Sequence, residues 1–268
     1  MMMALHRTLA SLALLLASCS QGRLDVVTLA PNSLNQGMVA HWPCDEGTGT
    51  TLGDFPSHRY DATILGATWL LDSGHAGFGG ALHFESGNSV QVESSFQPAS
   101  DSWSVSLWVR PAAWASPTPP PDNGDTYVTL ISTEIVRLGG WEMNVRFPQL
   151  DRTWRYHFAY PNPGDAGGIG YQWAETVGFD VDQWTHLVAV VDSSDAMQIL
   201  FYKNGERSAE KAITSLILPG SVALYFGTWS DGGRYFVGDL DDIVIYDRAL
   251  TSDEVVLLHT QPAPSVLR

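Results

Sequence analysis

Two neighbouring stretches of the sequence place polar side chains at alternate positions, where together they could bind a sugar. Successive side chains of a β-strand point to opposite faces of its sheet, so each polar set lines one face. Residues 148–151 link the stretches, and we expect a hairpin in which both sets share that face. Its side-by-side donors and acceptors suit sugar hydroxyls or acidic sugars. The residues of this predicted face are Glu142, Asn144, Arg146, Arg155 and His157.

Aromatic residues near this face are further candidates for ligand contact. Tyr171 and Trp173, at the glycine-rich loop from Pro163 to Gly170, could stack on a sugar ring. Trp108 lies on the polar side of its own strand, and we interpret it mainly as part of the fold. The alternative is that the whole face is a solvated sheet surface, with Glu142 and His157 as a salt-bridged surface pair and not an acid/base pair.

A second candidate site is a calcium ion near the ends of the domain. Asp45 and Glu46 follow the first expected strand, and Asp241 lies in the last. Carboxylate and carbonyl oxygens are the ligands that Ca²⁺ takes, and an extracellular module would bind it with a Kd of roughly 10⁻⁴–10⁻³ M. The alternative is that these carboxylates cap turns and face water.

No catalytic motif accompanies these groups. The sequence lacks a Glu-x-Asp-x-x-Glu or Glu-x-Asp-x-Glu run, which would supply two carboxylates from one strand. It also lacks a Gly-x-Ser-x-Gly elbow and a His-Glu-x-x-His helix. We therefore predict that the protein is not an enzyme.

The elements that must position these groups are strands. Residues 103–110 alternate cleanly, and residues 183–191 are apolar on both faces, as in the middle of a sandwich. Residues 197–206 end in Asn-Gly, a strong hairpin signal, and residues 79–84 and 89–92 suggest another hairpin. Residues 238–246 read as a buried strand, with Leu240 and Val244 on one face and Ile243 and Ile245 on the other.

A short helix should close the chain. Thr251 is followed three residues later by Glu254, which gives a capping box before an apolar run, and we expect this helix to seal the end of the fold. Elsewhere helical periodicity is almost absent, and 25 glycines and 15 prolines suit many short strands joined by turns. A net charge of −15 argues against nucleic acid, whose phosphates require clustered lysine and arginine.

The first residues predict export. A weak basic start and an apolar run lead to Leu16-Ala17-Ser18-Cys19, which resembles a bacterial lipobox. The resemblance implies a signal peptide over 1–18 and a lipid on Cys19 that anchors the chain to the outer membrane or cell surface; plain secretion is the alternative. Cys44 is the only other cysteine, so we expect a buried thiol, or a bridge to Cys19 if lipid is not attached.

Six stretches in order resemble the laminin-G-like modules of the concanavalin A-like lectin/glucanase superfamily. They are residues 39–47, 80–84, 103–109, 184–190, 201–205 and 238–250, and the likeness runs from about Gly37 to His259. The resemblance implies an all-β jelly-roll sandwich of two antiparallel sheets, frequently with structural calcium, that binds glycans or proteins. It places a tether at 19–36, the domain at 37–260 and a tail at 261–268. The alternatives are a structural or interaction protein of the cell envelope, or a glycoside hydrolase or lyase.

Overall fold

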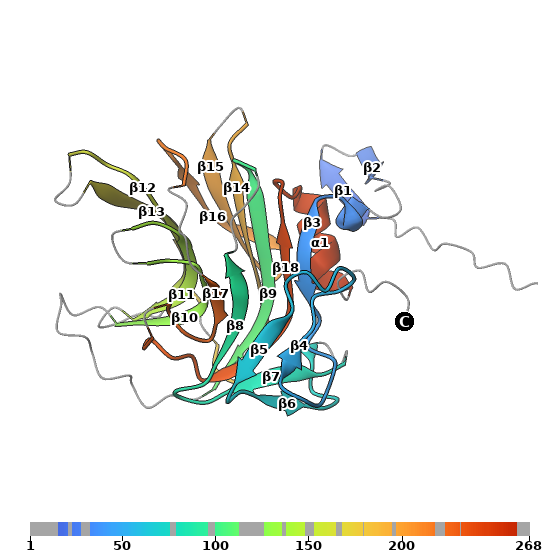
Figure 1. Cartoon of the computed structure of the whole chain (residues 1–268). Coiled ribbons are helices and arrows are strands. Elements are labelled where there is room, and N and C mark those ends of the chain that lie inside the picture. The colour runs from blue at the N-terminus through green and yellow to red at the C-terminus, as the bar shows by residue number, and fades with distance from the viewer. Residues whose placement is uncertain are drawn as a thin grey trace, which may run out of the picture.

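The computed structural model describes residues 16–20, 23–27, 33–75, 79–95, 100–112, 126–135, 138–147, 153–164, 168–178, 180–194, 197–217, 223–230 and 232–261. Within them the chain forms two large antiparallel sheets and a C-terminal helix (Figure 1). This confirms the predicted sandwich. The proline-rich stretch at 117–124 and the tail at 262–268 lie outside these residues.

The two sheets are built from strands that are far apart in the sequence. The first sheet has the order β13-β12-β11-β10-β17-β8-β5-β4. Its strands are β4 (Thr51–Leu52), β5 (Ala62–Leu65), β8 (Ser89–Ser95), β10 (Thr126–Ser132), β11 (Trp141–Phe147), β12 (Thr153–Pro161), β13 (Ile169–Thr176) and β17 (Ala223–Phe226). The second has the order β16-β15-β14-β9-β18-β7-β6, and β3 also pairs with β18. Its strands are β3 (Met38–Trp42), β6 (Thr68–Leu70), β7 (Ala81–Phe84), β9 (Trp103–Pro111), β14 (Thr185–Asp192), β15 (Gln198–Lys203), β16 (Glu206–Ala212) and β18 (Gly238–Tyr246).

The main core lies between the sheets, where the inward residues of both pack together. In β9 the alternation predicted from the sequence is confirmed, because Val105, Leu107 and Val109 all belong to this core. Large aromatic residues fill it from the first sheet, among them Trp154, which is fully buried. Burial of a large apolar side chain contributes roughly 1.5–3 kcal/mol.

Strand β18 is central, as predicted, and Val244 lies opposite Ile243 and Ile245, but the face assigned to Leu240 was wrong. Leu240, Ile243 and Ile245 all point into the main core, whereas Val244 packs on the opposite side of the sheet. The register of β18 against β9 shifts between Asp241 and Val244, and Asp242 has φ 43°. A β-bulge inserts one extra residue, and this reverses the alternation after it.

One predicted hairpin is confirmed and another is wrong. Asn204 and Gly205, with φ 52° and 80°, turn β15 into β16. Strands β7 and β8, by contrast, do not pair: β7 lies beside β18 and β6, and β8 beside β17 and β5. The connection between them crosses from one sheet to the other, a step that alternation alone cannot distinguish from a hairpin.

Helix α1 (Ser252–Thr260) covers the outer face of the second sheet (Figure 1). Both hydrogen bonds of the predicted capping box are present between Thr251 and Glu254. Val255 and Leu258 bury against a second apolar cluster that includes Val190 and Tyr246. The helix therefore closes this side of the sandwich, as the sequence indicated.

The N-terminal predictions fall largely outside the described residues, which exclude 1–15. Strand β1 (Leu16–Ser20), which joins the end of the expected signal peptide to the start of the expected tether at Cys19, pairs with β2 (Arg23–Val27). A 3₁₀ turn, η1, spans Ser33–Asn35. Within the part of the chain that is described, no helix is long and apolar enough to cross a membrane. Cys44 has a free, buried thiol, and burial, together with the charges of Asp241 and Glu46, raises its pKa.

Candidate functional site

The polar residues predicted from the two alternating stretches do share one sheet face. Strands β11 and β12 pair antiparallel, with Glu142 opposite His157 and Asn144 opposite Arg155. Strand β13 adds Trp173 opposite His157. The other face of the same strands is packed into the core, so the predicted hairpin and its polarity are both confirmed.

This face is not a solvated surface. Glu142 and Asn144 have no exposed area, and His157 is only 6% exposed. The prediction that Glu142 and His157 form a surface salt bridge was therefore wrong in its location, because the pair is buried with 3.8 Å between His157 Nε2 and Glu142 Oε2. Buried charged groups require partners, and others supply them here.

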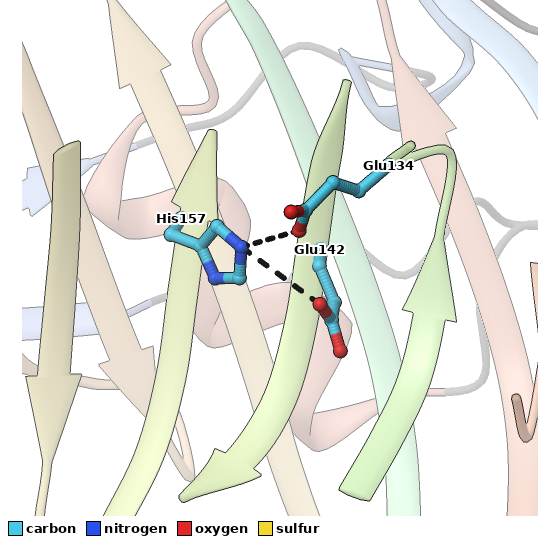
Figure 2. Close-up of side chains that lie close together, drawn as sticks. All are labelled: Glu134, Glu142 and His157. Atoms are coloured by element: carbon cyan, nitrogen blue, oxygen red, sulfur yellow. Dashed lines mark hydrogen bonds and ion pairs between the residues drawn. The ribbon is translucent and has the colours of Figure 1, made fainter. Parts of the chain in front are cut away.

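Glu134 completes a buried cluster that the sequence did not reveal. It lies in the connection between β10 and β11, and its Oε2 is 2.6 Å from His157 Nε2 (Figure 2). Its backbone N–H donates to Ser132 Oγ, and its carbonyl accepts a hydrogen bond from Ser230. Gly140, with φ 99°, returns the chain into β11. The β10–β11 connection thus holds the Glu134 carboxylate against the imidazole of His157.

Burial and nearby charges shift the pKa values of the two carboxyls of the cluster in opposite directions. Burial raises the pKa of Glu142, and the nearby charge of Glu134 raises it further. Burial alone would also raise the pKa of Glu134, but the charge of His157 and the hydrogen bond from it lower the pKa below its ordinary value. Glu134 therefore carries the more stable negative charge, and Glu142 is the carboxyl that most needs a compensating partner.

Arg234 is that partner, and it belongs to a row of stacked side chains. Its Nη1 is 3.3 Å from Glu142 Oε2. Its guanidinium lies 4.1 Å from the ring centre of Trp229 and 5.1 Å from that of Tyr127. The guanidinium of Arg155 lies 5.6 Å from the ring centre of Tyr127 and 4.7 Å from that of Trp173. We call this row, Trp173, Arg155, Tyr127, Arg234 and Trp229, the arginine ladder.

The arginine ladder has one exposed aromatic ring and two buried donors without a hydrogen-bond partner among the described residues. Trp173 is 43% exposed at one end of the row. Arg155 donates from Nη1 to the Tyr127 hydroxyl at 3.2 Å, but its Nε and the indole N–H of Trp229 have no hydrogen-bond partner among the described residues. Cation–π contacts of this kind hold both guanidinium planes in fixed orientations.

The three carboxylates predicted to share calcium are each engaged separately. Asp45 Oδ1 accepts from the Gly80 N–H at 2.7 Å, and Glu46 Oε1 from the Gly53 N–H at 2.7 Å. Asp241 is paired with His75 Nδ1 at 2.8 Å. Among the described residues, Glu134, Glu142 and His157 are the group of three whose possible ligand atoms lie within 4.8 Å of one another. Calcium binding stays a prediction.

Trp108 is part of the fold, as interpreted from the sequence. It is 6% exposed and stacks on His75 at 4.2 Å and on His259 of α1 at 5.3 Å. His186 is buried beside it, with Nε2 2.9 Å from Ser106 Oγ. A sugar could not reach this ring without displacing α1.

This histidine cluster predicts a pH-dependent stability. Burial, and the nearby His259 and His75, lower the pKa of His186 well below 6.5. The unfolded chain binds a proton there that the folded chain excludes, so stability falls as pH drops below about 6.5. Lowering the pH from 7.5 to 5.5 should reduce the free energy of unfolding by up to about 1.4 kcal/mol through His186. Urea denaturation across this range should show the loss.

The matched test is the substitution His186→Gln, which keeps a neutral hydrogen-bonding group. Burial raises the pKa of Asp241 to about 6, which works in the opposite direction. That titration is common to both proteins, so the difference between their curves isolates His186. The variant should have the flatter curve, while His58→Gln, at an exposed pair with Asp61, should keep the wild-type slope. Parallel curves for wild type and His186→Gln would contradict the assignment.

The sequence predicted the residues that β11, β12 and β13 contribute to this face, but not those from other parts of the chain. Tyr127, Glu134, Trp229 and Arg234 come from separate connections and a neighbouring strand, which no periodic pattern joins to β11 and β12. A weak signal existed for Glu134, because it is the only carboxylate between Asp125 and Glu142. Tyr171 and Trp173 lie on β13 itself, and not in the loop before it.

Comparison with known proteins agrees with this architecture. A family model described as the concanavalin A-like lectin/glucanases superfamily matches residues 84–256. Domain 4 of AbnA, a GH43 extracellular arabinanase from Geobacillus stearothermophilus solved with arabinotriose, is similar at 18% identity and TM-score 0.60, covering 83% of this chain and 98% of that one.

Toxin binding domains share the fold as well. The binding domain of Paraclostridial Mosquitocidal Protein 1 is 17% identical with TM-score 0.59, over 85% of this chain and 52% of that one. The binding domain of Botulinum Neurotoxin DC, solved in complex with SialylT, is 15% identical with TM-score 0.58, over 84% and 51%. The chain thus spans about half the length of these toxin domains.

Proposed function

The chain belongs to the concanavalin A-like lectin/glucanase superfamily, and we propose that it is a non-catalytic module that binds carbohydrate outside the cell. The observation that carries the proposal is the arginine ladder, which joins β10, β12 and β13 to the β17–β18 connection and ends in the exposed ring of Trp173. Aromatic faces stack on sugar rings, and fixed guanidinium groups donate to hydroxyls and carboxylates. Similar folds solved with arabinotriose and with SialylT support a glycan as the ligand class.

The arrangement of the acids favours binding over catalysis. Glu142 has no exposed area and Glu134 is 3% exposed, so neither reaches a substrate from its present position. The carboxylates are better suited to holding His157 and the ladder residue Arg234 in place.

We further propose a location at the cell envelope. The support is the sequence around Cys19, whose lipobox-like pattern would give a lipid anchor in the outer membrane or at the cell surface, and secretion is the alternative. Both routes place the acidic domain where extracellular glycans or proteins occur. A protein ligand would meet the same face, since a stacked arginine row also suits protein partners.

The test is retention on immobilised glycans, comparing arabino-oligosaccharides with sialylated oligosaccharides. Trp173→Ala should weaken binding at least about 30-fold, because a central aromatic contact contributes about 2 kcal/mol or more. Arg155→Met should weaken binding of acidic sugars more than of neutral ones. Glycan-reducing ends should not accumulate during incubation.

A matched control comes from the second sheet. Arg110 stacks on Trp184 at 4.9 Å, which repeats the arginine–tryptophan pair away from the candidate face. Trp184→Ala should leave glycan retention unchanged. If the wild-type protein binds no glycan, or if Trp173→Ala and Trp184→Ala behave alike, the proposed face is wrong.

A further inference from the structure

We propose that Glu134, Glu142 and His157 form a binding site for one divalent transition metal ion, of the Zn²⁺ or Mn²⁺ class. The three side chains converge from the β10–β11 connection, β11 and β12 (Figure 2). One imidazole nitrogen with two carboxylate oxygens is a donor set for these ions, whereas Ca²⁺ takes oxygens alone. The ion would bind whether or not the arginine ladder binds glycan.

The spacing of the donor atoms fits such an ion. Around zinc, bonds of about 2.0–2.2 Å place neighbouring tetrahedral ligands about 3.3–3.6 Å apart. His157 Nε2 lies 2.6 Å from Glu134 Oε2 and 3.8 Å from Glu142 Oε2, values on either side of that spacing. A displacement of less than about 1 Å of the Glu134 carboxylate opens the position. Three protein ligands leave one place for water or a ligand atom.

Asn144 provides a second and independent indication. Its side chain is fully buried, and its Oδ1 has no hydrogen-bond partner among the described residues. The same amide lies 3.4 Å from Nδ1 of His157, the ring nitrogen turned away from the carboxylates. A metal-bound histidine needs an acceptor for its other N–H. Turning the Asn144 amide by half a revolution supplies that acceptor and removes the unsatisfied oxygen.

Both oxygens of Glu142 have partners, and Oε2, which Arg234 contacts, is the one that faces His157. Thr129 Oγ1 donates to Oε1 at 2.5 Å and so fixes the carboxylate. Arg234 approaches Oε2 at 3.3 Å from the side of Trp229, and its side chain is 31% exposed. Two carboxylates balance the charge of a divalent ion, while Arg234 stays at the outer edge. The ion would tie the loop that carries Glu134 to the sheet beneath the arginine ladder.

The experiment uses the full-length protein, stripped with EDTA and titrated with ZnCl₂, MnCl₂ or CaCl₂ by calorimetry and thermal denaturation. We expect one saturable site for Zn²⁺ or Mn²⁺, a rise in Tm of several degrees, and a weaker response to Ca²⁺. Co²⁺ bound at the site should show a visible absorption spectrum of nitrogen and oxygen ligation.

Variants distinguish an ion held by these three residues from ions bound elsewhere on the acidic surface. His157→Gln and Glu134→Gln should abolish the saturable site, and Asn144→Leu should weaken it about 10- to 100-fold. His58→Gln, at an exposed histidine and aspartate, should bind as wild type does. Trp173→Ala should keep the metal while losing glycan. A folded wild type with no saturable site, or His157→Gln with wild-type affinity, would overturn the proposal.

Discussion

Replacement of Gly140 by alanine is expected to lower the free energy of unfolding by about 2–6 kcal/mol and the Tm by roughly 5–20 °C. Gly140 has φ 99°, where an L side chain is strained. An added Cβ would also lie 2.4 Å from the Thr133 carbonyl oxygen and 2.6 Å from the Glu134 Cα. Backbone atoms cannot rotate away as a flexible side chain can, so the Glu134 loop must shift.

The control for this prediction has the same backbone strain without the contact. Gly87 has φ 95°, and nothing lies within 4 Å of its added Cβ. Gly87→Ala should cost only about 1–3 kcal/mol, from strain alone. Circular dichroism melts of both variants would measure the difference. Equal losses would show that contact with the Glu134 loop contributes nothing.

Gly140→Ala should also reduce metal binding, because it displaces Glu134 from His157. Ala159 N–H donates to the Gly140 carbonyl at 2.9 Å, so the shift would reach β12 as well. Gly87→Ala should leave the metal site intact. The pair of variants therefore connects loop geometry to the site as well as to stability.

The second large effect is expected at Arg248, whose loss should cost about 3 kcal/mol. Its guanidinium forms two 2.8 Å hydrogen bonds with Glu254, and it also donates to the carbonyls of Gln36 and Ser33. The Glu254 side chain is 6% exposed. Arg248→Met would leave that carboxylate buried with the capping box alone, and would release the segment before β3.

The pH dependence of this loss has a definite sign. Burial alone would raise the pKa of Glu254, but the hydrogen bonds from Arg248 lower it below 4.5. A depressed carboxyl pKa stabilises the fold above the unfolded value and loses that contribution as pH falls through the folded value. The stability difference between wild type and Arg248→Met should therefore begin to shrink as the pH falls below about 4.5.

An exposed ion pair provides the comparison. Arg207 and Glu210 are 3.2 Å apart, with both side chains more than half exposed. Arg207→Met should change stability by less than about 1 kcal/mol, because solvent screens such pairs. Urea denaturation at pH 7 would measure both variants. A loss at Arg248 no larger than at Arg207 would contradict the role assigned to Arg248.

The polar face shows which features a local sequence pattern can predict and which it cannot. Glu142 and His157 were predicted on one sheet face because strand periodicity and a short connection fix their register. Their burial was not predicted, since it depends on the Glu134 loop, on Arg234 and on Trp229 from other parts of the chain. The surroundings of Asp241 were not predicted either. The sequence assigned this residue to calcium, and the fold pairs it with His75.

Local sequence was enough to predict the strand patterns, the Asn204-Gly205 hairpin, the capped C-terminal helix and the two-sheet class, because each depends on residues close together in the chain. It was not enough to predict that β7 and β8 belong to different sheets, that Asp242 forms a bulge, or that Glu134 and the arginine ladder meet over β11 and β12. These features depend on contacts between distant segments, whose energies no local pattern encodes. The chemistry of the face is therefore a property of the assembled sandwich.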